Sequence, residues 1–432
     1  MAADIPFRRA PLMSLDEALG QVLSHVNAIT ETEFVSTLEA DGRYLAEDLI
    51  SALQVPPHDN SAMDGYAVRV EDLQASGLKL RVTQRIPAGQ QGHELKLGEA
   101  ARIFTGAPIP PGANAVVMQE DVQIVQTETN APDDSTDKPV VQVNTVPKLG
   151  QWIRRSGEDV RKGDVVLPRG TRLSPASLGL AASIGRSQLL IVRKPRVALF
   201  STGDELVMPG DIAPENMQPG AIYNSNRFFL RALLLRSGCA VTDLGIVPDN
   251  LPDTLNVLKE AAKAHDLVLT SGGVSVGEED HVKPAVTQLG HLNLWQISMK
   301  PGKPFAFGQL NVHHTAQLSS AYFMGLPGNP VSSYVTFQLL VRPFLMALQG
   351  QNAVAPQPYL LQSNFDFPKP DKRREFLRVK RNAEGSLDLF PNQSSGVLTS
   401  VVWGDGVIDN PGLQAIHKGD WVRFFPFSDW LQ

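Results

Sequence analysis

The chain has 432 residues, 42% of them hydrophobic and 19% charged, and a formal net charge of −6. This length predicts two to four domains with substantial cores, and the composition is ordinary for a globular protein. The acidic balance argues against a dedicated nucleic-acid-binding protein. Cys239 is the single cysteine, which excludes an intrachain disulfide and a multi-cysteine metal site. We interpret it as a small buried hydrophobe in a protein of a reducing compartment.

The terminal and apolar segments of the sequence bear on where the protein resides. The N-terminal residues lack the apolar core of a signal peptide, and Arg or Pro interrupts each later apolar stretch before it reaches membrane-spanning length. No run of five or six like charges marks a tail. We therefore expect a cytoplasmic protein with no membrane partner.

The first part of the chain is predicted to hold a helix followed by β structure. Residues 14–27 combine a capping box with an apolar helical face, so they are expected to dock on a later part of the chain. A second helix is expected over 39–48. Short apolar runs between 80 and 146 alternate with turn residues and indicate an inserted β unit, with a polar hairpin tip over 126–139. The predicted domains are an N-terminal helix (1–27), a discontinuous β-rich linking domain (28–46 and 164–189) and an inserted β domain (47–163).

Two loops of the inserted β unit are rich in turn residues and polar side chains. The first holds Asp59 and Asp64 together with two further oxygen-bearing side chains within six residues, and the second begins at Thr105. A plain Asx-turn loop remains the alternative for the first. The strands expected around these loops are residues 115–118, 122–125 and 140–143.

From residue 195 the pattern changes to strands that alternate with helices. Buried strands are expected over 197–200, 241–247 and 267–270, and helices over 227–237, capped by Asn226, and 252–263. Serial βαβ units predict a parallel sheet with helices on both faces. A polar spacer over 311–320 follows, then a long helix opened by Asn329 and Pro330 and reaching Leu348. These segments define a central domain (190–349), and the short strands beyond it, one of them at 401–402, define a C-terminal β domain (350–432).

Ligands in such sheets bind beyond the carboxyl ends of the strands. Three loops fall there: 201–205, 248–249 and the glycine-rich loop 271–280. The glycines allow backbone N–H groups to approach an anion, and the acidic residues that follow suggest phosphate together with Mg²⁺. Lys300 and Lys303 are expected at the same edge. Taken singly, an Asp at a strand end is more often a helix cap than a metal ligand. A single lysine is more often a solvated surface residue than part of a site.

The sequence does not favour a hydrolase or a histidine-based metal site. No Gly-x-Ser-x-Gly elbow is present, and the nine histidines lack metal-ligand spacing. The pair His313-His314 lies in the polar spacer. The convergent loops are therefore the leading candidate site.

Six motifs in order resemble the molybdopterin molybdenumtransferases, the family of bacterial MoeA and the gephyrin E domain. They begin at Asp59, Thr105, Ser201, Ser271, Lys300 and Gly325 and read DNSAMDGYA, TGAP, STGDEL, SGGVSVG, KPGKP and GLPGNPVS. The resemblance implies an elongated homodimer of four-domain subunits. Its fold class is α/β plus β, with a central doubly wound molybdopterin-binding αβ domain, a β-rich insertion and a C-terminal β domain. The central domain would share its fold with the adenylyltransferase that acts one step earlier, which is a possible handover partner.

The resemblance also implies a reaction and a set of site residues. Family members insert molybdate into adenylylated molybdopterin with Mg²⁺-dependent release of AMP. The implied catalytic residues are Asp59, Thr105, Asp159, Glu205, Asp249, Asp280 and Lys300, of which Glu205, Asp249 and Asp280 would hold the metal. The implied substrate-binding residues are Ser201, Thr202, Gly203, Ser271, Gly272, Gly273, Ser275, Lys303, Pro327, Asn329, Pro330, Arg378 and Ser395. Asp59, Thr105 and Asp159 would act from the partner subunit.

Two positions depart from the family pattern, and two other functions compete with transfer. Gln296 stands where relatives often have a basic residue, and Ser394 replaces a glycine. The alternatives are a non-catalytic dimeric scaffold of the gephyrin E-domain type and molybdopterin adenylyltransferase activity itself. The retained acidic and lysine residues argue against the scaffold, and the extra β domains argue against the adenylyltransferase.

Overall fold

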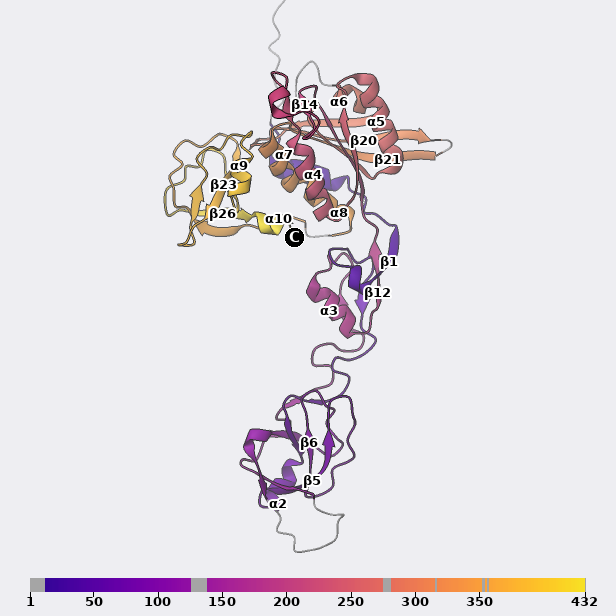
Figure 1. Cartoon of the computed structure of the whole chain (residues 1–432), viewed down its shortest axis with the longest axis vertical. Helices are drawn as coiled ribbons and strands as arrows, with labels where there is room; N and C mark the ends of the chain where they lie inside the picture. Colours follow the sequence, from indigo (N-terminus) through magenta and orange to yellow (C-terminus); the bar gives the residue numbers. More distant parts are fainter. Residues whose placement is uncertain are drawn as a thin grey trace, which may run out of the picture.

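The computed structural model shows an elongated chain built from several packed units (Figure 1). A β unit lies at one end, a small linking unit follows, and the central αβ unit lies at the other end with the C-terminal β unit beside it. The domain boundaries expected from the sequence remain predictions. The structure describes residues 12–125, 138–274, 281–314, 317–351, 354–355 and 357–431.

The N-terminal helix α1 (Leu15–Ser24) forms within the predicted segment. Ser14 caps it in a capping box with Glu17, and the helix buries Leu15, Ala18 and Val22. These side chains join the core of the central unit, where α1 contacts helix α8 (Arg342–Leu348). The apolar face therefore docks on a segment more than three hundred residues away in sequence.

The linking unit is assembled from both sides of the inserted β unit. Strand β1 (Thr32–Ser36) pairs with β12 (Gln188–Val192), and β2 (Leu49–Ile50) pairs with β11 (Val165–Leu167). A short 3₁₀ turn η1 (Thr37–Glu39) and helix α3 (Pro175–Ser183) pack beside them.

The second helix predicted over 39–48 is wrong. Tyr44 and Leu45 instead form β-bridges to Arg172 and Ile191. Pairing with distant segments overrides the local helix preference of this stretch.

The distal β unit contains a six-stranded sheet in the order β7-β4-β6-β5-β9-β8. The predicted strands form as β7 (Ala115–Met118), β8 (Val122–Val125) and β9 (Val140–Val143). Most of the predicted hairpin tip, residues 126–137, lies outside the described residues. The remaining elements are β3 (Asn60–Ser61), β4 (Gly65–Val68), α2 (Val70–Ala75), β5 (Lys79–Ile86), β6 (Glu99–Ile103), η2 (Gln119–Asp121) and β10 (Ile153–Arg154).

The central unit holds a six-stranded sheet in the order β16-β13-β17-β21-β20-β18. Alternate residues of β13 lie in two different core clusters, Val197 and Leu199 in one and Ala198 and Phe200 in the other. Since α4 contributes to the first cluster and α5 and α6 to the second, helices cover both faces. The bounds are β13 (Arg196–Thr202), α4 (Ser225–Arg236), β16 (Ala240–Val247), α5 (Leu251–Ala264), β17 (Leu267–Ser271), α6 (Val282–Leu289), β18 (Gly290–Gln296), β20 (Pro304–His314) and β21 (Gln317–Leu326).

Three expectations for this unit are corrected by the structure. The sheet is mixed, because β20 runs antiparallel to both β21 and β18. The predicted polar spacer over 311–320 is strand where it is described: residues 311–314 belong to β20 and residues 317–320 to β21, and the two strands pair. Helix α4 is capped by Asn224, whose side chain accepts from the backbone N–H of Arg227, and not by Asn226. Cys239 is buried, as expected.

The long helix predicted from Pro330 to Leu348 forms with an irregular centre. It consists of α7 (Pro330–Thr336), a π-helical segment η4 (Phe337–Val341) and α8. Pro343 lacks an N–H, and in a regular α-helix its ring would crowd the carbonyl of Leu339, which accounts for the irregularity. By length and composition the helix could cross a membrane, but 78% of it is buried inside the protein, as in a core helix.

The C-terminal unit is a sheet that takes one strand from the central unit. Strand β19 (Met299–Lys300) pairs in parallel with β23 (Arg374–Arg381). Residues Val401 and Val402, expected in a strand, lie in helix α9 (Thr399–Trp403). The other elements of this unit are β22 (Tyr359–Gln362), β24 (Leu387–Leu389), β25 (Gly406–Asn410), β26 (Trp421–Pro426) and α10 (Phe427–Leu431).

A two-stranded sheet follows β13 in the central unit. It consists of β14 (Leu206–Val207) and β15 (Ile222–Tyr223), with turn η3 (Pro214–Asn216) between them.

Candidate functional site

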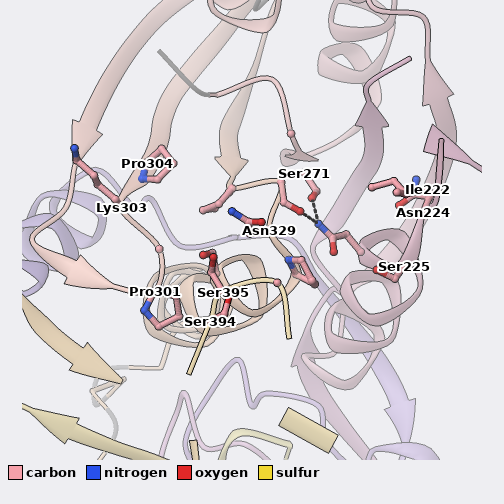
Figure 2. A pocket seen from close by; sticks show the side chains of 18 of the residues that line it. Ile222, Asn224, Ser225, Ser271, Pro301, Lys303, Pro304, Asn329, Ser394 and Ser395 are labelled. Carbon is pink, nitrogen blue, oxygen red and sulfur yellow. Dashed lines mark hydrogen bonds between the residues drawn. The ribbon is translucent and has the colours of Figure 1, made fainter. Parts of the chain in front are cut away.

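A cleft of about 940 Å³ opens at the carboxyl ends of β13, β17 and β21. Segments of the central unit line it together with two segments of the C-terminal unit, Arg373 and residues 393–396, and Figure 2 shows Ser394 and Ser395 of the latter. The predicted site residues among its lining are Thr202, Glu205, Ser271, Gly272, Lys300, Lys303, Pro327, Asn329, Pro330 and Ser395. The structure therefore brings together residues that are almost two hundred positions apart.

The loops after β13 and β17 approach each other closely. Gly272 has φ +95°, and a Cβ at this position would lie 2.8 Å from the backbone oxygen of Thr202. Only glycine accommodates both the left-handed conformation and this contact. Gly273 also has positive φ, +66°. Ser201 lies beneath these loops, 1% exposed, and does not line the cleft.

A buried asparagine connects two of the cleft loops. Asn226 Nδ2 donates to Ser271 Oγ at 2.7 Å and to the backbone oxygen of Gly328, also at 2.7 Å. The sequence predicts Asn226 only as a helix cap. No local pattern distinguishes the two roles, because both place an asparagine in the first turn of a helix.

Asn329 lies at the start of α7, but its side chain makes no capping hydrogen bond. It lines the cleft, and Figure 2 shows it among Ser271, Ser394 and Ser395. The amide of Asn329 is therefore available to a ligand. Ser394, one of the two departures from the family pattern, also lines the cleft, whereas the other, Gln296, does not.

The predicted metal-binding carboxylates are partly described. Thr202 Oγ1 donates to Asp249 Oδ1 at 3.2 Å, and a Cβ at Gly203 would lie 2.6 Å from Glu205 Oε2. Glu205 and Asp249 thus flank the end of β13. Asp280 and Ser275 lie outside the described residues, and within the described ranges no group of three His, Cys, Asp or Glu side chains gathers. Two carboxylates together with substrate phosphates form a donor set that suits Mg²⁺.

Three cationic side chains lie on the cleft wall. Lys300 Nζ lies 3.1 Å from Glu375 Oε1, whereas Lys303 forms no ion pair with another residue that the structure describes. Arg373, which the sequence analysis did not select, also lines the cleft. Its guanidinium donates two hydrogen bonds to Asp371, at 3.0 and 2.8 Å, and holds the pKa of that carboxyl well below its usual range. The three cations suit an anionic ligand.

Arg378 supports the cleft from behind and does not line it. It is 1% exposed, and its guanidinium donates to Ser400 Oγ at 3.1 Å and to the backbone oxygen of Ser394 at 3.3 Å. Burial lowers the pKa of Arg378 to about 10. The expectation that Arg378 reaches into the cleft is not met in this structure, where it holds the loop that carries Ser395.

Asp59 and Thr105 lie in the distal β unit, whereas Asp159 lies beside Val160, which packs in the core of the linking unit, and none of the three lines the cleft. Asp59 accepts from the backbone N–H of Ser156 at 2.8 Å and from Arg155 at 2.7 Å. Thr105 donates to Asp64 through both its backbone N–H and its hydroxyl. Figure 1 places this unit at the opposite end of the chain from the cleft. Within one subunit these residues connect loops of their own unit.

Comparison with known proteins defines the class of this three-part arrangement. Three protein-family models match in order: "MoeA N-terminal region (domain I and II)" over residues 13–185, "Probable molybdopterin binding domain" over 198–347 and "MoeA C-terminal region (domain IV)" over 361–427. The crystal structure of the molybdopterin biosynthesis MoeA protein of Pyrococcus horikoshii is similar, with a TM-score of 0.79 and 28% sequence identity, covering 96% of this chain and all of that one.

Curated relatives identify the family. Molybdopterin molybdenumtransferase of Haemophilus influenzae is 45% identical over 430 residues, covering 97% of this chain and 100% of the relative. The protein of the same name from Bacillus subtilis is 33% identical over 419 residues, covering 94% and 91%. The chain belongs to the molybdopterin molybdenumtransferase family, whose members are transferases of molybdenum cofactor biosynthesis.

Proposed function

We propose that the protein inserts molybdate into adenylylated molybdopterin and releases AMP. The observation that supports this proposal is the cleft at the carboxyl edge of the central sheet, which is lined by three cations, the carboxylate of Glu205 and glycine-bearing loops, while Asp249 accepts a hydrogen bond from the lining residue Thr202. A pyrophosphate linkage carries charge that cations neutralise, and its cleavage depends mainly on positioning and electrostatics. The substrate and the cleft are therefore complementary in charge.

The residues of the cleft take distinct parts in this proposal. Lys300 and Lys303 hold phosphate or molybdate oxygens, while Asn329 and Ser395 orient the molybdate. Gly272 lets backbone N–H groups approach the nucleotide. Glu205 and Asp249 would hold Mg²⁺, which when bound supplies charge neutralisation at the pyrophosphate.

The test is incubation of the purified protein with adenylylated molybdopterin, Mg²⁺ and molybdate, with AMP release as the readout. We expect AMP release that depends on both molybdate and the divalent ion. Folded protein that releases no AMP under these conditions would contradict the proposal and favour the scaffold alternative. AMP release that ignores molybdate would contradict the assigned second substrate.

We further propose that the protein acts as a cytoplasmic homodimer in which the partner subunit supplies Asp59, Thr105 and Asp159. The distance between these residues and the cleft within one subunit motivates the proposal (Figure 1). The upstream adenylyltransferase is the proposed source of substrate. A sedimentation mass near that of one 47.0 kDa subunit at micromolar concentration would contradict the dimer.

Mixed dimers test the sharing of sites directly. Asp59→Asn and Lys300→Met each lower activity strongly but measurably in this proposal, whereas a mixed dimer contains one cleft in which both residues are intact. Random mixing of the two impaired variants should therefore recover about a quarter of wild-type activity, as expected for a two-fold dimer. No recovery in mixed dimers of verified composition would exclude the shared site.

A further inference from the structure

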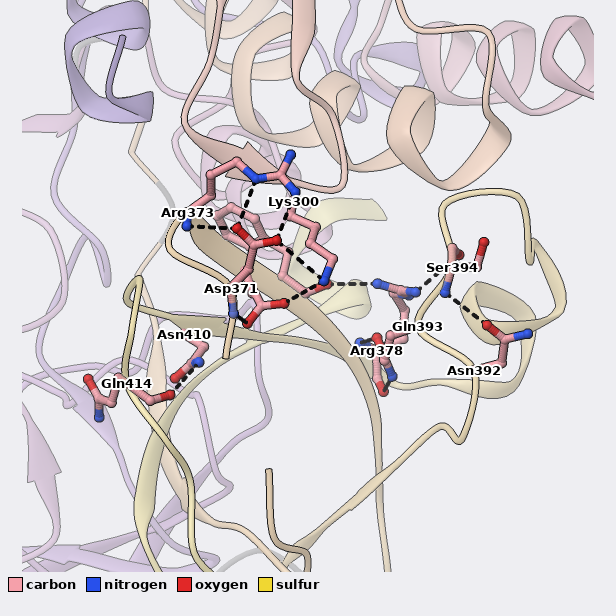
Figure 3. Close-up of polar contacts among 11 residues, drawn as sticks. Lys300, Asp371, Arg373, Arg378, Asn392, Gln393, Ser394, Asn410 and Gln414 are labelled. Carbon is pink, nitrogen blue, oxygen red and sulfur yellow. Dashed lines mark hydrogen bonds and ion pairs between the residues drawn. The ribbon is translucent and has the colours of Figure 1, made fainter. Parts of the chain in front are cut away.

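Four charged side chains form a cluster where the central and C-terminal units meet at the cleft wall. Figure 3 shows Lys300, Asp371 and Arg373 in contact, and the fourth member is Glu375. Lys300 Nζ lies 3.1 Å from Glu375 Oε1 and 3.7 Å from Asp371 Oδ2. The cluster therefore joins a cation of the cleft to two carboxylates of the C-terminal unit.

The backbone brings Lys300 and Glu375 together. Lys300 ends the short strand β19, and the parallel pairing of β19 with β23 places it in register with Glu375. The two residues are 75 positions apart in sequence. The two-residue strand β19 joins the edge of the C-terminal sheet, and this pairing thus determines which carboxylate faces Lys300.

Glu375 is buried and both of its oxygens have partners. It is 1% exposed, Oε1 accepts from Lys300 Nζ, and Oε2 accepts from the backbone N–H of Asp371 at 2.8 Å. Burying a carboxylate is costly unless it is paired and hydrogen-bonded. The position of the Lys300 ammonium is therefore coupled to the burial of Glu375.

Asp371 is a weaker partner for Lys300. Its carboxylate already accepts two hydrogen bonds from the guanidinium of Arg373, and it lies farther from Nζ, at 3.7 Å against 3.1 Å for Glu375. An ammonium has three donors, so Lys300 retains capacity for an anion in the cleft after it has bonded to Glu375. Its side chain is 42% exposed, which leaves that capacity accessible.

We propose that Glu375 is a positioning residue of the transfer reaction and acts through Lys300. A free lysine side chain samples many rotamers, and fixing it costs rotamer entropy. Glu375 fixes Lys300 before substrate binds, so the anion-binding wall is complete only when the C-terminal unit is docked on the central unit. This inference rests on the proposed function, since it assigns Lys300 to the substrate anion.

The chain offers a matched control for a buried carboxylate in the same sheet. Asp409 is 2% exposed, lies on β25 opposite Phe376, and pairs with Arg374 at 2.8 Å. Asp409 does not line the cleft, and within the described structure its ion pairs are with Arg374 and Arg423 and not with Lys300. Asp409→Asn should therefore disturb the sheet as much as Glu375→Gln does, without affecting Lys300.

The test is a double-mutant cycle in the AMP-release assay. Glu375→Gln should lower kcat about ten-fold and weaken the binding of inorganic pyrophosphate, because the lysine remains but loses its fixed position. In the Lys300→Met background the same substitution should have no further effect on kcat. The neutral pair Glu375→Gln with Lys300→Met also leaves no unpaired buried charge, so this double variant should fold. The effects of Asp409→Asn and Lys300→Met on kcat should instead be independent, so the double variant should show the product of the two single effects.

Two outcomes would overturn the proposal. One is a wild-type kcat in Glu375→Gln. The other is a double variant whose kcat is reduced by the product of the factors measured for Glu375→Gln and Lys300→Met alone. Calorimetric titration of the same variants with inorganic pyrophosphate separates failure of this inference from failure of the proposed function. If wild-type protein binds pyrophosphate but releases no AMP, the proposed function is contradicted. The coupling of Glu375 to Lys300 is then tested by comparing the pyrophosphate dissociation constants of the single and double variants.

Discussion

The central cleft and the distal β unit both carry motifs of the same family, but they use their polar side chains differently. In the cleft, Lys303 and Asn329 face open space and have no ion pair or capping bond in the described structure. In the distal unit, Asp59 and Thr105 are engaged in hydrogen bonds that connect two loops. These two motif residues thus hold loops in shape, and their part in a reaction stays a proposal that depends on the proposed dimer.

Burial and free hydrogen-bonding capacity therefore distinguish a residue that holds a loop in shape from one that can contact a ligand better than residue type does. Asp59 is partly exposed, so its carboxylate can keep its bonds to Ser156 and Arg155 and still meet a group from another subunit. Arg378 shows the opposite case, because its guanidinium is buried and bonded to the protein. Variants matched between regions test this distinction.

The largest effect is expected at the glycine that joins the cleft loops. Gly272→Ala adds a Cβ 2.8 Å from the Thr202 oxygen at a residue with φ +95°, so both steric and conformational strain follow. Gly106→Ala in the distal unit meets nothing within 4 Å at φ +82°. The conformational term alone is about 1–2 kcal/mol. Urea unfolding should show a clearly greater loss for Gly272→Ala, and equal losses would contradict the close contact.

The next effect concerns asparagines that connect segments in each region. Asn226→Ala removes two buried hydrogen bonds in the cleft and should cost about 1–3 kcal/mol and reduce AMP release. Asn114 in the distal unit bonds to Glu71 and to the backbone N–H of Val70. Asn114→Ala should lower the melting temperature without changing kcat. Retained activity in Asn226→Ala at temperatures where it is folded would contradict its role in shaping the cleft.

A smaller effect on stability is expected at Asp59. The Asp59–Arg155 pair is exposed, so Asp59→Asn should change the free energy of unfolding by at most about 1 kcal/mol. If the carboxylate serves the cleft of a partner subunit, AMP release should nevertheless fall sharply. Arg155→Gln removes the same ion pair but keeps the carboxylate, and it should remain active. Equal activity in the two variants would return Asp59 to a purely structural role.

The smallest effect is a dependence of stability on pH. The Arg373 side chain lowers the pKa of Asp371, whereas the backbone N–H of Ser156 is the main cause of the lowered pKa of Asp59. A lowered folded-state pKa contributes stability above the unfolded pKa, near 3.9, and this stability is lost as the pH falls through the folded value. The stability difference between wild type and Asp371→Asn should thus be constant from about pH 8 to 5 and shrink below about pH 4. A difference that shrinks already at pH 6 would contradict the assignment.

Local patterns determined much of the fold from the sequence. The capping box predicted α1, and alternating or continuous apolar runs predicted β7, β8, β9 and β17 because side-chain burial in these elements follows a short period. The order of strands and helices after residue 195 predicted a sheet covered on both faces. The glycine-rich and lysine-rich loops could then be placed at its ligand-binding edge.

What the sequence did not predict depends on partners that are distant along the chain. Residues 39–48 form no α-helix, because Tyr44 and Leu45 bridge to two distant segments. Residues 311–314 and 317–320 form paired strands, because β20 and β21 continue the central sheet. Residue spacing within a motif contains no information on such pairings.

The electrostatic environment of the site was likewise decided only by tertiary structure. Sequence patterns placed Lys300 at the correct edge of the sheet but could not reveal Glu375 as its partner, because the pairing of β19 with β23 brings the two together from different units. Nor could they show that Arg373 lines the cleft while Arg378 is buried behind it. Residue type determines which charges a chain can offer, and packing determines which of them reach a ligand.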